Sequence, residues 1–195
     1  MLNKEILKIY EDEKALLRGH FILSSEKHSS VYLQSAIVLS IPKYLNIIAK
    51  NMISLIKKNI SFQEIELIVS PAMGGIVIGN KIGELLKKQS IFLERVKGNF
   101  TLRRGFEIKE KQKILLVEDV ITTGKSSLEC VNCVENYGGE VIGLSSIIDR
   151  SNIDLNFSFP YISCLKIDAP IYDKSNIPLK LKKIPPTKPG SRFIK

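Results

Sequence analysis

Residues 114–127 read ILLVEDVITTGKSS, and this stretch decides the fold that we predict. Its first four residues are all apolar, which is typical of a strand buried on both faces of a sheet. Its last four, Gly124 to Ser127, open a helix. In an open α/β sheet, ligands bind beyond the carboxyl ends of the strands. We therefore expect Glu118 and Asp119, which end the apolar run, to emerge at a binding crevice and not in the core.

The residues that follow the two acids suit an anion. The Thr122, Thr123 and Ser126 hydroxyls, together with backbone N–H groups and the positive end of the new helix, can all face a phosphate. Only Gly124-Lys125-Ser126 of the Walker pattern GxxxxGK[ST] is present, and GxGxxG is absent. Acids followed by a phosphate loop predict a ligand with hydroxyls at one end and a phosphate at the other. The alternative is that the acids only cap the helix and that Gly124 is only a turn.

The flanking sequence alternates between strands and helices and predicts a doubly wound, mostly parallel α/β sheet. The expected core strands span residues 65–70, 91–95, 114–118 and 141–148, and the expected helices span residues 76–88 and 125–137. Before this core, we predict helices over residues 2–18 and 42–58, with a hairpin of two extended segments over residues 20–40. After the core, residues 161–168 suit one further strand.

The composition indicates one cytoplasmic domain. The chain has 195 residues, of which 44% are hydrophobic, which is enough for one full core. No apolar run reaches the roughly 18 residues of a membrane span, and acids interrupt the first residues where a signal peptide would be apolar. The three cysteines fit a reducing compartment. Cys130 and Cys133 form a CxxC, which we interpret as two packed side chains because they lie past the start of their helix.

The net charge of +9 is concentrated in a tail. Residues 174–195 contain seven basic and no acidic side chains, so the remainder of the chain carries only +2. Because no folded basic face with interleaved aromatics is visible, we predict no nucleic-acid partner. The alternative is a regulator that binds RNA or DNA through this tail.

A second strand-end turn, SPAMGG, occupies residues 70–75. Its backbone N–H groups can also face an anion, so two phosphate-ready turns on one sheet suggest a diphosphate as well as a monophosphate. Taken alone, the turn would be read as a tight connection in which glycine supplies a positive φ.

The stretch from Val96 to Gln112 is 17 residues long and joins two core strands. It carries Lys97, Arg103 and Arg104 next to the glycine hinges Gly98 and Gly105, which is typical of a lid that closes over phosphates. The alternative is a solvated hairpin with ordinary surface cations.

Two acids at a strand end followed by a Thr/Gly/Ser loop resemble the phosphoribosyl diphosphate (PRPP) motif of the type I phosphoribosyltransferases. Three further segments resemble the shorter bacterial branch of this family that uses orotate: FILSSEKHSSVYLQS at 21–35, ERVKGNFTLRRGF at 94–106 and KPGSR at 188–192. The resemblance implies a single domain over residues 1–195. It would have a hood at about 1–40 plus part of the C-terminal segment, a core at about 60–150 and a basic tail at 174–195.

The resemblance also implies roles for individual residues. The ribose hydroxyls would be held by Glu118 and Asp119. The other PRPP contacts would come from Val120, Ile121, Thr122, Thr123, Gly124, Lys125, Ser126, Arg95, Ala72, Met73 and Gly74. Orotate would be bound by Thr122, Arg150, Tyr32 and Leu33, and Lys97, Arg103 and Arg104 would assist catalysis from the lid.

The chain departs from the family pattern at several positions. Many relatives carry a lysine where Gly74 stands, the hood lysine of the family falls at Ser24, and the lid lysines and histidine of the better-known branch have no clear counterparts. Arg150 makes chemical sense at a strand end, where a planar guanidinium can bind a carboxylate or a ring carbonyl. Alternatively it pairs with Asp149 or Asp154 on the surface.

We therefore expect a Mg²⁺-dependent transfer of the phosphoribosyl group from PRPP to orotate in pyrimidine synthesis, by a homodimer with shared active sites. Mg²⁺ would be held mainly through substrate oxygens and water, without a protein cage. Two alternatives are a PRPP-sensing regulator that binds nucleic acid and a sister transferase that uses another base. The regulator is disfavoured because no helix-turn-helix precedes the domain.

Overall fold

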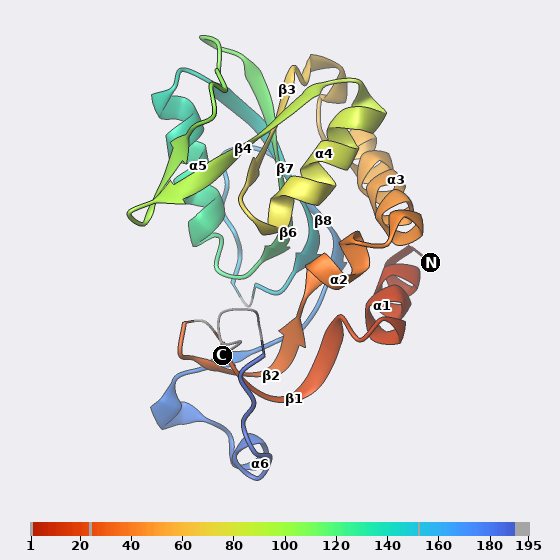
Figure 1. The fold of residues 1–195 in the computed structure, drawn as a ribbon, viewed down its shortest axis with the longest axis vertical. Coiled ribbons are helices and arrows are strands. Elements are labelled where there is room, and N and C mark those ends of the chain that lie inside the picture. Colours follow the sequence, from red (N-terminus) through yellow and green to blue (C-terminus); the bar gives the residue numbers. More distant parts are fainter. Residues whose placement is uncertain (1, 24, 152, 190–195) are drawn as a thin grey trace.

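The structure is a computed structural model that describes residues 2–23, 25–151 and 153–189. Its core is a six-stranded sheet with the strand order β5-β4-β3-β6-β7-β8 (Figure 1). The strands are β3 (Leu67–Pro71), β4 (Gln89–Val96), β5 (Asn99–Leu102), β6 (Lys113–Ile121), β7 (Glu140–Asp149) and β8 (Tyr161–Lys166). Only β5 is antiparallel to its neighbour, whereas the other adjacent pairs are parallel. The predicted mostly parallel α/β fold is confirmed.

Helices cover both faces of this sheet (Figure 1). On one face lie α1 (Leu2–Asp12), α3 (Pro42–Asn59) and α4 (Gly74–Leu86), and on the other lies α5 (Lys125–Asn136). Each face has its own apolar core, and β6 contributes to both. Leu115 and Val117 pack with the α3 and α4 side, while Ile114 and Leu116 pack with the α5 side. The apolar run from 114 to 117 is therefore buried on both faces, as its sequence predicts.

The first predicted helix is too long. It ends at Asp12, and residues 16–22 leave the helix to form β1 (Leu16–Ile22). Lys14 has a φ of +54°, which breaks the helix, and the pairing of β1 with β2 (His28–Leu33) then outweighs the helical spacing of Leu16 and Leu17. Similarly, the end of the predicted hairpin is a short helix, α2 (Ser35–Leu39), because the chain turns there toward α3.

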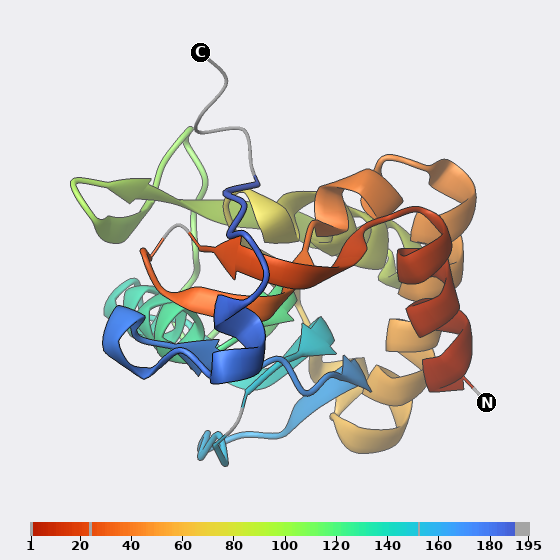
Figure 2. The ribbon, with the colours of Figure 1, turned by 90° about the horizontal axis from the view of Figure 1, so that it is seen from below.

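A smaller unit, which we call the hood, lies beyond the carboxyl ends of the core strands (Figures 1 and 2). It consists of the antiparallel sheet β1-β2-β9, with β9 at Ile171–Tyr172, and of the C-terminal segment with α6 (Leu179–Lys182). Thr187 in that segment pairs with Phe21 of β1. The 3-10 turns are η1 (Phe62–Glu64) and η2 (Lys174–Asn176).

Two buried histidines connect the hood sheet to the C-terminal segment within the hood. His20 Nε2 lies 2.8 Å from His28 Nδ1, and His20 Nδ1 lies 2.9 Å from the Ile184 carbonyl oxygen. Since a carbonyl only accepts, His20 donates from Nδ1 to Ile184. The end of the KPGSR match (190–192) and the hood position Ser24 lie outside the described residues. Across the described ranges, no helix combines the length and the apolar character needed to cross a membrane.

Candidate functional site

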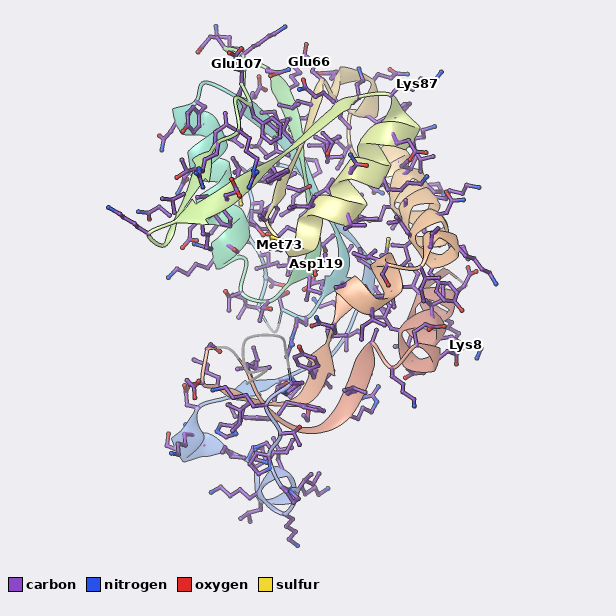
Figure 3. The ribbon with its side chains drawn as sticks, in the orientation of Figure 1. Lys8, Glu66, Met73, Lys87, Glu107 and Asp119 are labelled. Atoms are coloured by element: carbon purple, nitrogen blue, oxygen red, sulfur yellow. The ribbon has the colours of Figure 1, made fainter. Side chains whose placement is uncertain are left out.

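The predicted ligand-binding residues gather where β3, β6 and β7 end. Met73, just after β3, and Asp119, near the end of β6, both lie at the end of the core sheet that faces the hood (Figure 3). Arg150 follows β7 directly, and the last residue of β6, Ile121, is paired with Asp149. The structure thus brings the three strand ends together, as parallel strands require.

The two acids lie on opposite faces of β6, because this strand continues three residues beyond its predicted end, to Ile121. Glu118 points to the α5 side, where its Oε1 accepts a 3.1 Å hydrogen bond from Ser127 Oγ, and only 6% of the residue is exposed. Asp119 points to the α4 side. The expectation that both acids emerge is therefore wrong for Glu118, although its role toward ribose stays a prediction.

The Asp119 carboxylate lies against the first residue of α4. A Cβ added at Gly74 would come within 2.5 Å of Asp119 Oδ1. A side chain at this position would therefore displace the Asp119 carboxylate. The peptide between Ala72 and Met73 is cis, and the Met73 side chain is 81% exposed. That a pyrophosphate contacts the backbone of this turn stays a prediction.

Burial raises the pKa of both acids. Desolvation, with a smaller contribution from the Asp119 charge, raises the pKa of Glu118 from 4.5 to about 8. Desolvation also raises the pKa of Asp119, and hydrogen bonds from the backbone and from Ser35 partly oppose this shift. The free protein therefore holds Glu118 in its neutral form at pH 7.

The raised Glu118 pKa predicts a loss of stability with rising pH. The unfolded chain releases this proton near pH 4.5, whereas the folded chain keeps it up to about pH 8. The contribution of Glu118 to the free energy of unfolding is therefore complete below pH 4.5. Between pH 4.5 and pH 8 it declines by at most about 1.4 kcal/mol per pH unit. Urea unfolding measures the free energy of unfolding of wild type and of Glu118→Gln. As the pH rises over this interval, the wild type should lose stability relative to the variant. A difference in unfolding free energy that stays constant from pH 5 to 8 would contradict the raised pKa.

The predicted phosphate loop occupies the turn between β6 and α5. Gly124 has a φ of +72°, which favours glycine, and α5 begins at Lys125. The first N–H groups of α5 accordingly point toward the ends of the strands. Arg95, on β4, donates from Nη2 to Ser126 Oγ at 3.0 Å and pairs with Glu129 at 2.5 Å. Arg95 therefore fixes β4 to the start of α5.

The predicted lid is an ordered hairpin at the edge of the sheet. β4 and β5 pair from Leu93 to Leu102, with Lys97 in the turn at a φ of +50°. Arg104 donates to both Glu94 oxygens at 2.8 and 3.1 Å, and Arg103 lies 3.8 Å from Glu94. Both arginines remain more than half exposed. The two lid arginines thus pair with their own hairpin in this structure, and the catalytic role of Lys97, Arg103 and Arg104 stays a prediction.

Arg150 is buried, and among the described residues it has no carboxylate partner. Only 6% of it is exposed, and Nη2 donates to Ser29 Oγ at 3.0 Å and to the Ala169 carbonyl at 3.1 Å. No partner for Nε exists among the described residues. The Asp149 carboxylate instead accepts the Ser151 N–H at 2.7 Å, so the surface pairing considered as an alternative is absent between these residues. Burial lowers the pKa of Arg150.

Tyr32 and Leu33, the other predicted orotate ligands, are half-buried on β2 of the hood. The Tyr32 hydroxyl donates to Gln34 Oε1 at 2.8 Å and so faces along its own strand. Residue spacing gave no sign of three further polar residues around the site, namely Tyr10, Ser29 and Ser35. The position of Ser127, in the first turn of the helix that follows the two acids, was predictable from the sequence.

The fold and these residues define a phosphoribosyl transferase domain. The sequence model of the phosphoribosyl transferase domain family matches residues 34–183. A Thermotoga maritima protein is 43% identical over 190 residues, which are 97% of this chain and 100% of that relative. An Erythrobacter litoralis protein is also 43% identical, over 98% of this chain and 99% of that relative. Both relatives are named orotate phosphoribosyltransferase, and this chain belongs to the orotate phosphoribosyltransferase family.

Solved structures agree on the fold. The crystal structure of orotate phosphoribosyltransferase from Aeropyrum pernix has a TM-score of 0.65 at 19% identity and covers 83% of this chain and 93% of that chain. The Mycobacterium tuberculosis orotate phosphoribosyltransferase in complex with inorganic phosphate has a TM-score of 0.61 at 20% identity, covering 84% of this chain and 96% of that chain. At these identities the likeness concerns the fold alone.

Proposed function

We propose that this protein transfers the 5-phosphoribosyl group from PRPP to orotate in pyrimidine biosynthesis, giving orotidine 5′-phosphate and pyrophosphate. The observation that carries this proposal is the Arg150 guanidinium. It is buried beside the acid-bearing end of β6, and no carboxylate within the described part of the chain pairs with it. A buried cation without a counter-ion is costly, and an anionic ligand would offset that cost. Orotate carries such a carboxylate, whereas uracil and the purine bases do not.

Each group of site residues would act on a different part of the substrates. Breaking the bond at C1 of the ribose builds positive charge on the sugar and negative charge on the departing pyrophosphate. The backbone of Ala72 to Gly74 would face the pyrophosphate, and the start of α5 would bind the 5′-phosphate. Asp119 and Glu118 would fix the ribose hydroxyls, and Arg150 would orient orotate so that its ring nitrogen attacks C1.

We include Mg²⁺ in the proposal. Among the described residues, no three His, Cys, Asp or Glu side chains gather as a metal site. The Asp119 carboxylate nevertheless offers the hard oxygen donors that Mg²⁺ prefers, and substrate oxygens and water would supply most of the rest. When bound, Mg²⁺ supplies positive charge that stabilises the leaving pyrophosphate. The buried, free cysteines support a reducing compartment, and the proposal places the reaction in the cytoplasm without a membrane or nucleic-acid partner.

A spectrophotometric assay tests the proposed function. The purified protein is given PRPP, Mg²⁺ and orotate, and the loss of orotate absorbance is followed. Uracil and hypoxanthine are then offered in place of orotate. The proposal expects turnover with orotate alone, because Arg150 selects a carboxylate. Faster turnover of either other base would instead assign a sister transferase.

We also propose a homodimer with shared active sites. A groove of 560 Å³ lies between α4 and β4, and its apolar lining includes Ile76, Val77, Phe92 and Phe106. Val77 is 45% exposed, and Met73, which directly precedes α4, is 81% exposed. The Arg104 guanidinium carbon lies 5.7 Å from the centre of the Phe92 ring. This surface therefore extends from the predicted pyrophosphate turn to the lid cations. A dimer interface through which one subunit's lid reaches the other subunit's active site would require such a surface.

Mixed dimers test whether the lid acts on the neighbouring subunit. One inactive variant carries Arg103→Ala with Arg104→Ala, and the other carries Asp119→Asn. After co-refolding in equal amounts, half of the dimers are heterodimers, and each has one site with both an intact pocket and an intact lid. Roughly a quarter of wild-type activity should return. Differential tags verify that heterodimers form, and a mixture that stays at background would assign each lid to its own subunit.

A further inference from the structure

The Arg95 side chain is held from several directions beside the predicted phosphate loop. Its Nη2 donates to Ser126 Oγ at 3.0 Å and to Glu129 Oε2 at 2.5 Å, and its Nη1 donates to the Gly98 carbonyl at 2.6 Å. The guanidinium carbon lies 4.0 Å from the centre of the ring of Phe100, which is the cross-strand partner of Arg95 in the β4–β5 hairpin. The ring and the carboxylate together leave the guanidinium little freedom to rotate.

The partners of Arg95 on α5 lie on the helix face that contacts this hairpin. Ser126, Glu129 and Cys133 are spaced at i, i+3 and i+7, so their side chains share one face of the helix. Cys133 Sγ donates to the Phe100 carbonyl at 3.4 Å, which is a second contact between α5 and the hairpin. Of these two contacts, the one that Arg95 makes lies at the start of α5, next to the phosphate loop.

The contact with Arg95 also decides how Ser126 can bind a ligand. A serine hydroxyl has one hydrogen to donate, and here its oxygen accepts from Arg95. Within the described part of the chain, no acceptor takes the Ser126 hydrogen. That hydrogen can therefore be donated to a phosphate oxygen at the loop.

The Glu129 carboxylate by itself would oppose a phosphate at this loop, because like charges repel. Its charge is directed to Arg95 at 2.5 Å, whereas Lys125 Nζ lies 4.0 Å away. The two side chains of the Arg95–Glu129 pair are 41% and 35% exposed, so solvent weakens their attraction. A pair of this kind adds little to the stability of the fold. Its main effect is to set the direction of the guanidinium.

We propose that Glu129 is a positioning residue, which orients Arg95 and, through Arg95, the Ser126 hydroxyl for the phosphate groups of PRPP. This inference rests on the proposed function, which assigns the 5′-phosphate to the start of α5. Three guanidinium N–H groups of Arg95 donate to the protein, which leaves Nε–H and one Nη1–H for the ligand. Glu129 itself touches no substrate and acts only through the arginine.

Two substitutions at Glu129 test this assignment. Glu129→Gln keeps an acceptor oxygen but loses the charge, and Glu129→Ala removes both. We expect the Kd for PRPP, measured by isothermal titration calorimetry, to rise about threefold in the glutamine variant and about tenfold in the alanine variant. The KM for PRPP should rise in the same order while kcat stays close to that of the wild type, because the lost interaction serves binding.

Glu135→Gln is the matched control. Glu135 is an exposed glutamate of the same helix, and within the described ranges its side chain forms no ion pair. The substitution removes the same charge from α5 without touching Arg95, so the PRPP affinity should stay at the wild-type value. A loss equal to that in Glu129→Gln would show that the net charge of the helix matters and not the contact with Arg95, and would reject the proposal.

The Arg95→Ala background separates positioning from a direct effect of the Glu129 charge. In this background there is no guanidinium to orient, and the carboxylate remains beside the loop. Adding Glu129→Gln should therefore cause no further loss and should tighten PRPP binding by up to about twofold, since it removes a repulsive charge. The same substitution would thus act in opposite directions in the two backgrounds. A loss as large as that in the wild-type background would reject the proposal.

The remaining outcomes are equally decisive. Tighter PRPP binding by the single variant Glu129→Gln would show that the carboxylate competes with the ligand for Arg95, and would overturn the positioning role. Unchanged affinity in both Glu129 variants, with thermal unfolding showing that they are folded, would also overturn it. A wild-type protein that binds PRPP but does not use orotate would refute the proposed base, and the affinity series would still decide the role of Glu129. If the wild type does not bind PRPP, both proposals fail.

Discussion

Asp119→Asn is expected to lower kcat/KM for PRPP by roughly 10²-fold or more, because an ionic hydrogen bond to the ribose contributes a few kcal/mol in the transition state. The amide has the same shape as the carboxylate, so its contact with Gly74 remains possible. The fold should therefore survive. Initial rates at several PRPP concentrations measure the loss, and circular dichroism with thermal unfolding shows that the variant is folded.

Glu118→Gln gives a comparison on the other face of β6. The pKa of Glu118 is raised to about 8, so at pH 6 the glutamine resembles the neutral side chain of the free wild-type protein. At pH 9 the wild-type side chain is charged and the variant is not. We expect a loss that grows with pH and reaches roughly 10²-fold where the carboxylate is ionised. Near-normal turnover of both Asp119→Asn and Glu118→Gln at pH 9 would reject the ribose assignment.

The sheet could be predicted from the sequence because the clearest patterns, such as apolar runs and turn glycines, belong to residues whose role is structural. The apolar residues from Ile114 to Val117 admit one interpretation, a strand covered on both faces, and both faces of β6 are indeed covered. Gly124 likewise marks the turn before α5, where its φ is +72°. Such local features do not depend on distant partners.

The side-chain directions at the site could not be predicted in the same way. The apolar run stops at Val117, but β6 continues to Ile121 because β7 extends beside it and pairs with it. This longer pairing turns Glu118 toward Ser127 and Asp119 toward α4. Tyr10 and Ser35 escaped prediction for the same reason, since their contact joins residues 25 positions apart.

The lid shows the same limit. Spacing identified the cations but not their partners, and the long connection was expected to reach over phosphates. In the structure, Glu94 binds Arg104 across the β4–β5 hairpin, and Arg95 stacks over Phe100 at 4.0 Å. These contacts form because the hairpin extends the edge of the sheet, which depends on tertiary pairing and not on the loop sequence alone.

Arg150→Ala is expected to weaken orotate binding by roughly 10²-fold, which corresponds to the loss of a buried, charge-assisted bidentate contact. PRPP affinity should change far less, because the phosphates are assigned to the start of α5 and to the turn at Ala72 to Gly74. Isothermal titration calorimetry with each substrate measures both affinities. Equal losses for orotate and PRPP would show that Arg150 supports the site as a whole and does not select the base.

Ser29→Ala is the matched control for this prediction, because Arg150 also connects β7 to the hood. Its Nη2 donates to Ser29 Oγ at 3.0 Å, and Ser29 Oγ donates in turn to the Pro170 carbonyl at 3.1 Å. Removing the serine breaks the hood contact and leaves the guanidinium in place. If Arg150 recognises the base directly, Ser29→Ala should keep most of the orotate affinity. If it matched the loss in Arg150→Ala, the arginine would act by holding the hood against the core, and the selectivity for a carboxylate would have to come from another group.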